Sequence, residues 1–220
     1  MSLQLFYHPL SSYSMKALIA LYENGTPFEY RMLSPEHPEN CAQFAGLWPI
    51  QKFPILLDGE RMVVEASIVI EHLALHYPGM VKLLPTDPKA ALEVRMMDRF
   101  FDNHIATPQQ KLVADVLRPE GEHDGYGTAE ARRKLDTAYA WLDNVMAHRI
   151  WAAGEEFSMA DCAAAPFLLY AHWSHPIPAL HEHVLAYLAR LRARPSFARA
   201  WAEAKPYRHM FPLGVPAGEE

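Results

Sequence analysis

Hydroxyl groups cluster near the N-terminus of the chain, in the stretch Leu10-Ser11-Ser12-Tyr13-Ser14. An alternating apolar segment precedes them and a helix-forming run follows, so the sequence predicts a strand-to-helix turn here. Backbone N–H groups at a helix N-terminus point toward such a turn, and the helix dipole favours an anion there. A serine hydroxyl at this place can donate a hydrogen bond to a thiolate, and it serves equally well as a plain N-cap.

Two later segments are weaker candidates for parts of a binding site. Lys52-Phe53-Pro54 leads into a strand pattern. From the residues alone we expect a trans Phe53–Pro54 bond, because only about 5–6% of X–Pro bonds are cis. Glu65-Ala66-Ser67 opens a helical pattern, where an acid stabilises the dipole and small side chains leave N–H groups open to an anion. An acid in the first turn is also common for purely structural reasons.

The elements that must position these groups alternate between strand and helix. The predicted elements are a strand over 3–7, a helix through 16–22, a strand over 28–33, at most a short helix within 34–50, a hairpin of 53–57 and 61–64, and a helix over 65–77. Asn24-Gly25 ends the first helix, and Asp58-Gly59 suits a tight hairpin turn. The last helix places Ile68, Val69, His72, Leu73 and His76 on one face.

The character of the sequence changes after this segment. Residues 84–88 are typical of a linker because they contain two prolines, and no strand alternation follows them. Helical patterns extend over 89–117, 128–150, 158–173, 180–191 and 196–205. We therefore predict an α/β domain over 1–79, a linker over 80–88 and an all-helical domain over 89–220.

Composition excludes several classes of protein. The 220 residues carry a formal net charge of −6, which argues against nucleic-acid binding because phosphate contacts need excess Lys and Arg. Cys41 and Cys162 form no CxxC pair, so neither a disulfide framework nor a cysteine zinc site is expected. No basic segment precedes an apolar run and no stretch of 18 apolar residues exists, so we expect a cytoplasmic protein without contact to membranes.

In their order along the chain, these segments resemble the cytosolic glutathione transferase family, in a bacterial, serine-type form close to its theta and zeta classes. The matching segments are Tyr7–Ser14, Lys52–Leu56, Val64–Leu73, Phe157–Cys162 and Ala193–Arg199. The resemblance implies a thioredoxin-like N-terminal domain, an all-α C-terminal domain and a homodimer. It also implies a cis Phe53–Pro54 bond, contrary to the expectation from the residues alone.

The resemblance assigns roles to individual residues. Ser11 matches the hydroxyl that binds the glutathione sulfur. Ser12 is the second candidate for this hydroxyl, because the sequence Ser-Ser-x-Ser also resembles the zeta-type members. Tyr7 ranks third and Tyr13 fourth. The glutathione-binding residues implied are Phe53 and Pro54 for the cysteinyl part, Gln51 and Lys52 for the glycyl end, and Glu65 and Ala66 for the γ-glutamyl group.

Two positions depart from the family pattern. Ala66 stands where the usual residue is serine, so one hydroxyl contact to the γ-glutamyl carboxylate is missing, and Ser67 is the candidate substitute. A hydrogen bond to a charged group contributes about 1.5–3 kcal/mol, so weaker glutathione binding is expected. Gln51 stands where many members have glycine.

The implied function is a glutathione transferase for detoxification, in which glutathione thiolate attacks a small hydrophobic electrophile. Lowering a thiol pKa from about 8.5 by two units needs about 2.7 kcal/mol, which a charge-assisted hydrogen bond and a helix N-terminus supply together. Alternatives are a glutathione-dependent cis–trans isomerase or peroxidase, or a non-enzymatic binding or regulatory protein. Residues 1–40 contain no cysteine, which argues against disulfide exchange through a protein thiol.

Two features outside this region are predicted to be structural. Ser158-Met-Ala-Asp161 fits a capping box, with Phe157 and Cys162 as its hydrophobic staple, and loss of Asp161 is expected to cost about 1 kcal/mol for the cap alone. The histidines at 172, 175, 181 and 183 suggest a metal site, but 181 and 183 point to different sides of a helix. We expect no metal.

Overall fold

Four short strands form one sheet in the N-terminal half of the protein. The structure is a computed structural model and describes residues 2–219. The elements of this half are β1 (Leu3–Tyr7), α1 (Ser12–Glu23), β2 (Phe28–Met32), α2 (Pro38–Leu47), β3 (Ile55–Asp58), β4 (Arg61–Val64) and α3 (Ala66–His76). The strand order is β2-β1-β3-β4, with β1 parallel to β2 and antiparallel to β3. The expected βαβ unit and hairpin are both present.

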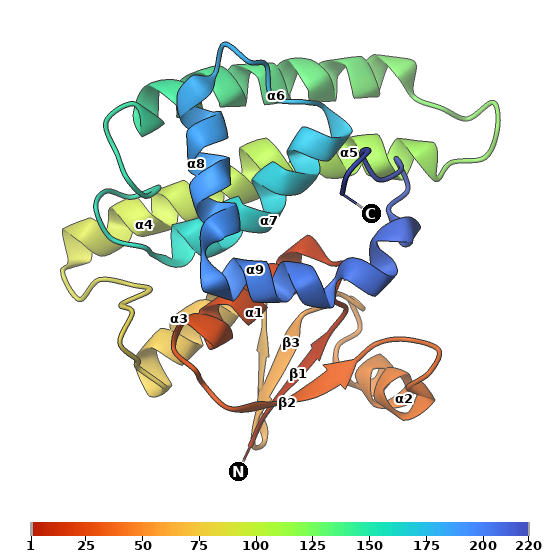
Figure 1. Ribbon diagram of the computed structural model, residues 1–220. Coiled ribbons are helices and arrows are strands. Elements are labelled where there is room, and N and C mark those ends of the chain that lie inside the picture. The colour runs from red at the N-terminus through yellow and green to blue at the C-terminus, as the bar shows by residue number, and fades with distance from the viewer. Residues whose placement is uncertain (1, 220) are drawn as a thin grey trace.

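The sheet separates two apolar layers, because successive side chains of a strand point to opposite faces. Leu5 and Leu56 are opposite each other on β1 and β3 and belong to the main core with α1 and α3. Their neighbours Phe6 and Ile55 pack with Phe44 of α2 in a smaller cluster. As a result α1 and α3 lie between the sheet and the helices of the second half (Figure 1).

Two local predictions need correction. Residues 34–50 contain a helix of 10 residues rather than at most a short one, because Pro38 occupies its first turn, where the missing N–H is not needed. The hairpin turn is Gly59-Glu60 rather than Asp58-Gly59, since Asp58 still pairs with Arg61. Gly59, with φ of 61°, supplies the left-handed conformation that this turn requires.

The predicted apolar face of α3 is only partly covered. Val69, His72 and Leu73 are buried, whereas Ile68 is 51% exposed and His76 is also exposed. Helical spacing identified residues on one side of the helix, but that side extends past the edge of the core.

The second half consists of helices. They are α4 (Pro88–Phe100), the π-helical segment η1 (Phe101–Ala106), α5 (Thr107–Val116), α6 (Gly125–Met146), α7 (Met159–Ser174), α8 (Glu182–Ala193), α9 (Pro195–Glu203) and the 3₁₀ segment η2 (Lys205–Met210). The single helix predicted over 89–117 is therefore three segments in succession. Pro108 lacks an N–H and crowds the carbonyl of His104, which accounts for the widened turn before it. Among residues 2–219, none of these helices is long and apolar enough to cross a bilayer.

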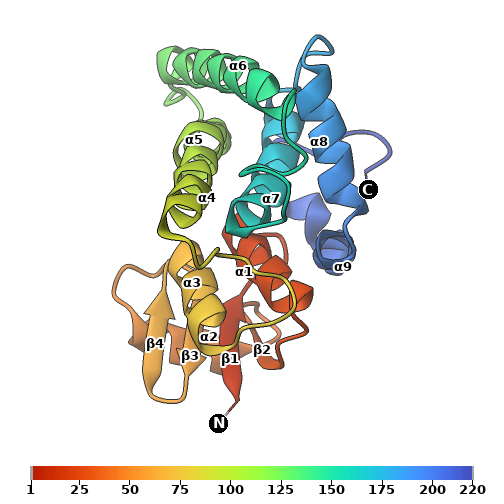
Figure 2. The same ribbon diagram turned by 90° about the vertical axis from the view of Figure 1, so that its left-hand side faces the viewer.

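Helix α7 is the centre of the helical domain and joins it to the sheet domain. Nearly all of its residues are buried, and it packs against α1, α4 and η1 (Figure 2). The Tyr170 hydroxyl donates a hydrogen bond of 2.8 Å to the carbonyl of Leu10, and the Phe167 ring meets Tyr13 edge-on. The serine-rich turn before α1 is therefore held from the other domain.

The predicted capping box is present at the start of α7. Asp161 accepts the backbone N–H of Ser158 at 2.8 Å, and the Ser158 side chain accepts the N–H of Asp161 in return. Asp161 is fully buried and also accepts the N–H of Ala152 at 2.8 Å and the hydroxyl of Tyr187 at 2.5 Å. These last two partners are distant in sequence, so this carboxylate contributes more than a helix cap.

We expect Asp161→Ala to lower the free energy of unfolding by at least about 4 kcal/mol, because four buried donors, the backbone N–H groups of Ser158 and Ala152 and the hydroxyls of Ser158 and Tyr187, lose their acceptor at about 1–3 kcal/mol each. Asp87→Ala is the matched control. Asp87 caps α4 through one bond of 2.8 Å to the N–H of Ala90 at an exposed site, and its loss is expected to cost about 1 kcal/mol. Urea unfolding of both variants measures the difference, and equal losses would contradict the extra role of Asp161.

Candidate functional site

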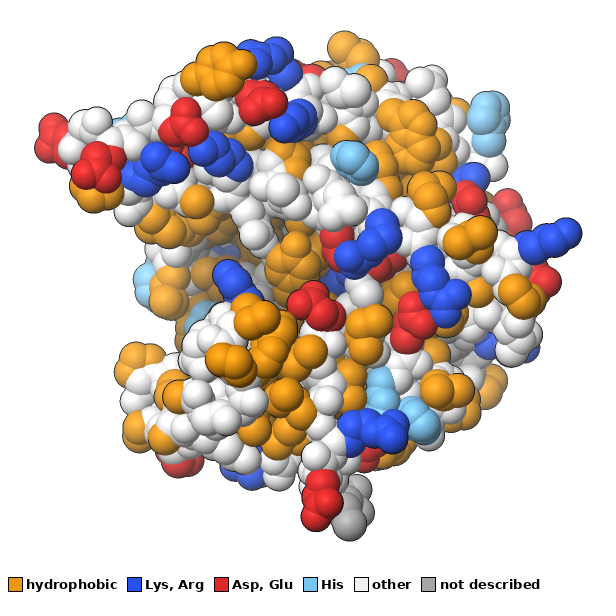
Figure 3. All heavy atoms as spheres, turned by 180° about the vertical axis from the view of Figure 1, so that it is seen from behind, with side chains coloured by type: hydrophobic (Ala, Val, Ile, Leu, Met, Phe, Trp, Pro, Cys, Tyr) orange, Lys and Arg blue, Asp and Glu red, His pale blue; other side chains and the backbone are white. Residues whose placement is uncertain are grey.

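Two neighbouring cavities open where the two domains meet, and Ser11 lines both of them. The main cavity has a volume of about 450 Å³ and the apolar cavity about 360 Å³. Figure 3 shows a hollow on one side of the molecule, between the helical domain and the sheet domain. Seven predicted site residues line the main cavity together: Ser11, Gln51, Lys52, Phe53, Pro54, Glu65 and Ala66.

Ser11 is the N-cap of α1 and faces the cavities with its hydroxyl engaged on one side only. The backbone N–H of Ser14 donates to Ser11 Oγ at 3.2 Å. A hydroxyl that accepts this bond still has its own proton to donate. Ser14 itself is fully buried and accepts the N–H of His8 at 3.3 Å, so it supports the turn. Ser11 can therefore donate to an anion placed at the helix N-terminus.

The other hydroxyl candidates lie differently. Ser12 lines the apolar cavity and is not among the residues around the main cavity. Tyr7 is only 6% exposed, packs on Tyr30 and lines neither cavity. Tyr13 lines both cavities, but burial raises the pKa of its phenol, so it stays protonated at neutral pH. Of these residues, Ser11 and Tyr13 are the two that border both spaces.

The segment before β3, residues 51–54, lines one side of the main cavity. The Phe53–Pro54 bond is cis, as the resemblance implied and the residues alone did not. Gln51 has φ of 54°, a conformation that favours glycine, which gives a physical reason for the glycine common at this position. The Gln51 amide donates to the carbonyls of Ala45 at 3.1 Å and Trp48 at 2.9 Å, so it stabilises the loop locally.

Glu65 and Ala66 form the N-terminus of α3 at the opposite wall. Glu65 is the N-cap and has φ of 68°, which is rare for a residue with a side chain. Such strained residues concentrate at functional sites. Ala66 begins the helix, where the first N–H groups lack acceptors within the helix. This wall therefore offers N–H donors to an anion and a carboxylate to a cation.

Sequence reasoning missed five residues around the main cavity as members of a binding site. They are Tyr13, which was considered only for the thiolate contact, and Trp48, Arg99, Asp102 and Gln110. The last three come from the helical domain. Arg99 and Asp102 are three residues apart on one helical path, but no local pattern indicates which domain they face. Only the folded structure, in which they line the same cavity as Ser11, identifies them.

An ion cluster around a buried ammonium connects this wall of the cavity to the domain junction. We name it the Lys16 cluster, and its members are Lys16, Ser67, Asp98, Arg99 and Asp102. The Lys16 ammonium is fully buried and lies 2.7 Å from Asp98 and 2.9 Å from Asp102. It also donates to Ser67 Oγ at 2.8 Å. Burial lowers the pKa of Lys16 to about 8 while Asp98 opposes the shift, so the ammonium remains mostly protonated at neutral pH.

Ser67 has a different role from the one suggested by its position after Ala66. Its hydroxyl donates to Asp98 Oδ2 at 2.7 Å and accepts from Lys16 and from Arg99 Nη2, each at 2.8 Å. It does not line the main cavity. The substitution of Ser67 for the missing hydroxyl at Ala66 is therefore not supported by its placement, because the hydroxyl is already used between the domains.

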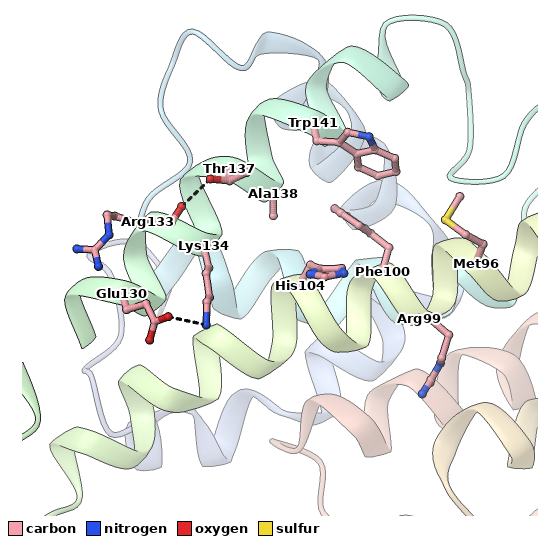
Figure 4. Close-up of a pocket in the computed structure, with 10 residues that line it drawn as sticks. All are labelled: Met96, Arg99, Phe100, His104, Glu130, Arg133, Lys134, Thr137, Ala138 and Trp141. Carbon is pink, nitrogen blue, oxygen red and sulfur yellow. Dashed lines mark hydrogen bonds and ion pairs between the residues drawn. The ribbon is translucent and has the colours of Figure 1, made fainter. Parts of the chain in front are cut away.

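A third and larger space, of about 980 Å³, lies between α4 and α6 and contains no predicted site residue. Phe100 and Trp141 face each other in it, with ring centroids 4.4 Å apart (Figure 4). His104 lines it as well, whereas Phe101 is fully buried in the core. In Figure 4 the Arg99 side chain extends from α4 toward the sheet domain, away from these rings.

The four histidines around α7 and α8 do not converge. His175 lies 2.7 Å from Asp136, and His172 accepts the N–H of Ile177 at 3.0 Å. Within residues 2–219, no group of three or more His, Cys, Asp or Glu side chains is arranged to hold a metal ion.

Comparison with known families identifies both halves of the chain. The family model described as "Glutathione S-transferase, N-terminal domain" matches residues 5–80. The model described as "Glutathione S-transferase, C-terminal domain" matches residues 125–204. Together they cover more than half of the chain and both of its structural halves.

Individual relatives are distant in sequence. Glutathione S-transferase GstB of Escherichia coli (strain K12) is 26% identical over 157 residues, covering 70% of this chain and 75% of that protein. FtsZ-localized protein A of Caulobacter vibrioides is 26% identical over 221 residues, covering 93% and 95%. A glutathione S-transferase of Methylobacterium radiotolerans, solved in complex with glutathione sulfonate, is 28% identical, with a TM-score of 0.78 and coverage of 91% and 94%.

The Lys16 cluster generates a stability prediction. Lys16→Met leaves Asp98 and Asp102 without their buried cation, so we expect the free energy of unfolding to fall by about 3–5 kcal/mol. Lys134→Met is the control, because Lys134 is exposed and pairs with Glu130 at 3.0 Å on the surface, worth about 0.3–0.5 kcal/mol. Denaturant unfolding compares them. A Lys16→Met protein as stable as the parent would show that the cluster adds nothing to the domain junction.

Proposed function

The chain belongs to the glutathione S-transferase family, and we propose that it activates the glutathione thiol through Ser11 and transfers the sulfur to a small apolar electrophile. One observation carries this proposal: Ser11 lies on the border between the main cavity and the apolar cavity. A sulfur next to this hydroxyl is reachable from both spaces. The tripeptide then occupies the main cavity and its reaction partner the apolar one.

The main cavity offers partners along the length of glutathione. Lys52 supplies a cation for the glycyl carboxylate at one end. The Phe53 backbone, next to the cis bond, is open to pair with the cysteinyl residue as an added strand would. Glu65 and the N–H of Ala66 receive the γ-glutamyl ammonium and carboxylate at the other end. All four residues line the same cavity as Ser11, which supports a binding mode in which the sulfur lies near the N-terminus of α1.

Thiol activation then needs no protein base. The thiol proton leaves to solvent, and the thiolate is stabilised by the Ser11 hydroxyl and the N-terminus of α1. These contribute about 1.5–3 and up to about 2 kcal/mol, enough to lower a thiol pKa by about two units. The thiolate sulfur forms a bond to the electrophilic carbon, and the displaced electron pair leaves with the leaving group or stays on the acceptor.

The second substrate is an apolar molecule, because the apolar cavity has few polar groups. Its walls include Leu10, Val113, Leu117, Tyr170, Phe211 and Pro212. They come from the serine turn, α5, α7 and the segment after η2. Apolar contact with a small number of polar groups is typical of sites for hydrophobic ligands.

A binding or regulatory role without turnover is the second candidate. Ala66 removes one ligand for glutathione, and a relative of similar length is known as FtsZ-localized protein A rather than as a transferase. The isomerase and peroxidase alternatives use the same activated thiolate and differ only in the second substrate. Retention on immobilised glutathione with turnover of electrophiles, peroxides or a maleyl-type isomerisation substrate separates these roles. Retention with no turnover favours the binding protein.

We further propose a homodimer that acts in the cytoplasm, where glutathione is reduced and thiols stay free. Large apolar side chains are exposed on three helices that lie one above another in Figure 2: Ile68 and Leu75 on α3, Leu92 and Met96 on α4, and Trp141 on α6. Exposed apolar patches of this kind mark interfaces. A second copy is the occupant that the family resemblance implies.

Ser11→Ala is expected to raise the pKa of the bound glutathione thiol by about 1–2 units and to lower kcat/KM about 10- to 100-fold, because one charge-assisted hydrogen bond is lost. Ser12→Ala is the control, since Ser12 borders only the apolar cavity. Thiolate absorbance against pH and steady-state kinetics measure the two effects. If Ser12→Ala gave the larger shift in thiol pKa, the role assigned to Ser11 would belong to Ser12.

Met96→Glu is expected to convert the dimer to a monomer, because a charge is buried in the proposed interface. Leu180→Glu is the matched control, as Leu180 is 73% exposed between α7 and α8, away from the patch. Light scattering after size exclusion gives the mass of each. A parent protein that is monomeric at micromolar concentration would refute the homodimer.

A further inference from the structure

The N-terminus of α3, which forms the γ-glutamyl end of the main cavity in the proposed function, lacks a side-chain hydrogen-bond donor for a ligand. Ala66 presents a methyl group, and the Ser67 hydroxyl is used in the Lys16 cluster. The N-terminus of α3 thus offers backbone N–H groups but no side-chain donor to an α-carboxylate. Carboxylates have two oxygens with about four acceptor positions, so they bind tightly where several donors converge.

Arg99 reaches this gap from the opposite domain. Its Nη2 donates to Ser67 Oγ at 2.8 Å, to Asp98 Oδ2 at 3.1 Å and to Asp102 Oδ2. Ser67 directly follows Ala66 in the chain, so the guanidinium is anchored next to the missing hydroxyl. Arg99 and Ala66 line the same cavity. Figure 4 shows the Arg99 side chain directed from α4 toward the sheet domain.

The guanidinium has donors left for a ligand. The bonds that Arg99 makes to other side chains within residues 2–219 all use Nη2. A guanidinium carries five N–H groups in a planar fork that matches a carboxylate, and those of Nε and Nη1 are not in these bonds. The Arg99 side chain is 53% exposed, so a molecule in the cavity can reach it.

The carboxylates around Arg99 hold it in place without cancelling its charge. Asp98 and Asp102 are shared between Arg99 and the buried ammonium of Lys16, so two anions face two cations. Because the side chain is already fixed, less rotamer entropy is lost when a ligand binds. The acids Glu65 and Asp102 also line the cavity, which gives this end one cation and two anions for a zwitterionic amino acid head.

From this geometry we propose that Arg99 binds the α-carboxylate of the γ-glutamyl residue of glutathione and replaces the serine hydroxyl that Ala66 lacks. The proposal rests on the proposed function, because it assumes glutathione in the main cavity. The helical domain would then contribute directly to glutathione binding. Arg99 would distinguish γ-glutamyl peptides from others by the free α-carboxylate of their first residue.

The test compares two ligands by calorimetric titration: glutathione, and the analogue 4-aminobutyryl-cysteinyl-glycine, which lacks only the α-carboxylate. Arg99→Gln is expected to weaken glutathione binding about 10- to 100-fold, as the loss of a charge-assisted hydrogen-bonded pair predicts. Its affinity for the analogue should stay within about twofold of the parent's, because the group that Arg99 recognises is absent. Arg99→Lys keeps the positive charge near Asp102 but not the planar fork of N–H groups. Its affinity for glutathione should lie between those of the parent protein and Arg99→Gln.

Arg95→Gln is the matched control. Arg95 lies one turn earlier on α4 and pairs with Glu71 of α3 through two bonds of 2.8 Å, so it also joins the domains. It does not line the main cavity, and its loss should leave both affinities unchanged. Adding Ala66→Ser to Arg99→Gln restores a hydroxyl donor and should recover a substantial part of the lost affinity for glutathione but not for the analogue.

The outcomes separate the two proposals. If Arg99→Gln binds glutathione as tightly as the parent protein does, the role of Arg99 is overturned and the proposed function is left intact. Equal weakening of both ligands by Arg99→Gln also overturns it, since Arg99 would then act only through the fold. A parent protein that binds neither ligand overturns the proposed function and this inference together.

Discussion

The structure depends on one buried ammonium at the contact between its two domains. Lys16 projects from α1 into the interior, where its side chain is fully buried, and it is held by carboxylates from α4 and η1. A charge in such a place is tolerated only when its partners are fixed, so the orientation of α4 against α1 is tied to this contact. The main cavity takes one wall from each domain. Its shape therefore follows from the same ion pairs that stabilise the junction.

This arrangement divides the chemistry between the domains. The sheet domain presents backbone groups and helix N-termini, which suit a peptide with charged ends. The helical domain contributes apolar walls around Tyr170 and Phe211, which suit a hydrophobic partner. Ser11 lies on the line between them because the turn before α1 is held by Tyr170 from one side and by the start of α1 from the other. The reactive sulfur is supplied by the ligand, so the protein needs no cysteine of its own in this turn.

The departures from the family pattern follow the same logic. The position of Ala66 lost a hydroxyl, while the neighbouring Ser67 is committed to the Lys16 cluster. A cation from α4 lies beside both. In the role proposed for Arg99, binding of the γ-glutamyl head is linked to the domain junction rather than confined to the α3 N-terminus. Arg99 belongs both to the Lys16 cluster and to the lining of the main cavity, so the proposed role couples ligand affinity to the stability of the junction.

The sequence by itself determined the parts that local physics controls. Alternation of apolar and polar residues predicted the strands. The serines around Ser11, just before a helical segment, predicted an N-cap, and the spacing of Ser158 and Asp161 predicted the capping box. It also brought seven residues of one cavity into view, through their resemblance to a family. It did not reveal the long-range partners of Asp161, the use of Ser67 in an ion cluster, the exposure of Ile68, or the presence of Arg99 and Asp102 at the site. Helical spacing states which residues share a face, and only the packing of one domain on the other decides what that face meets.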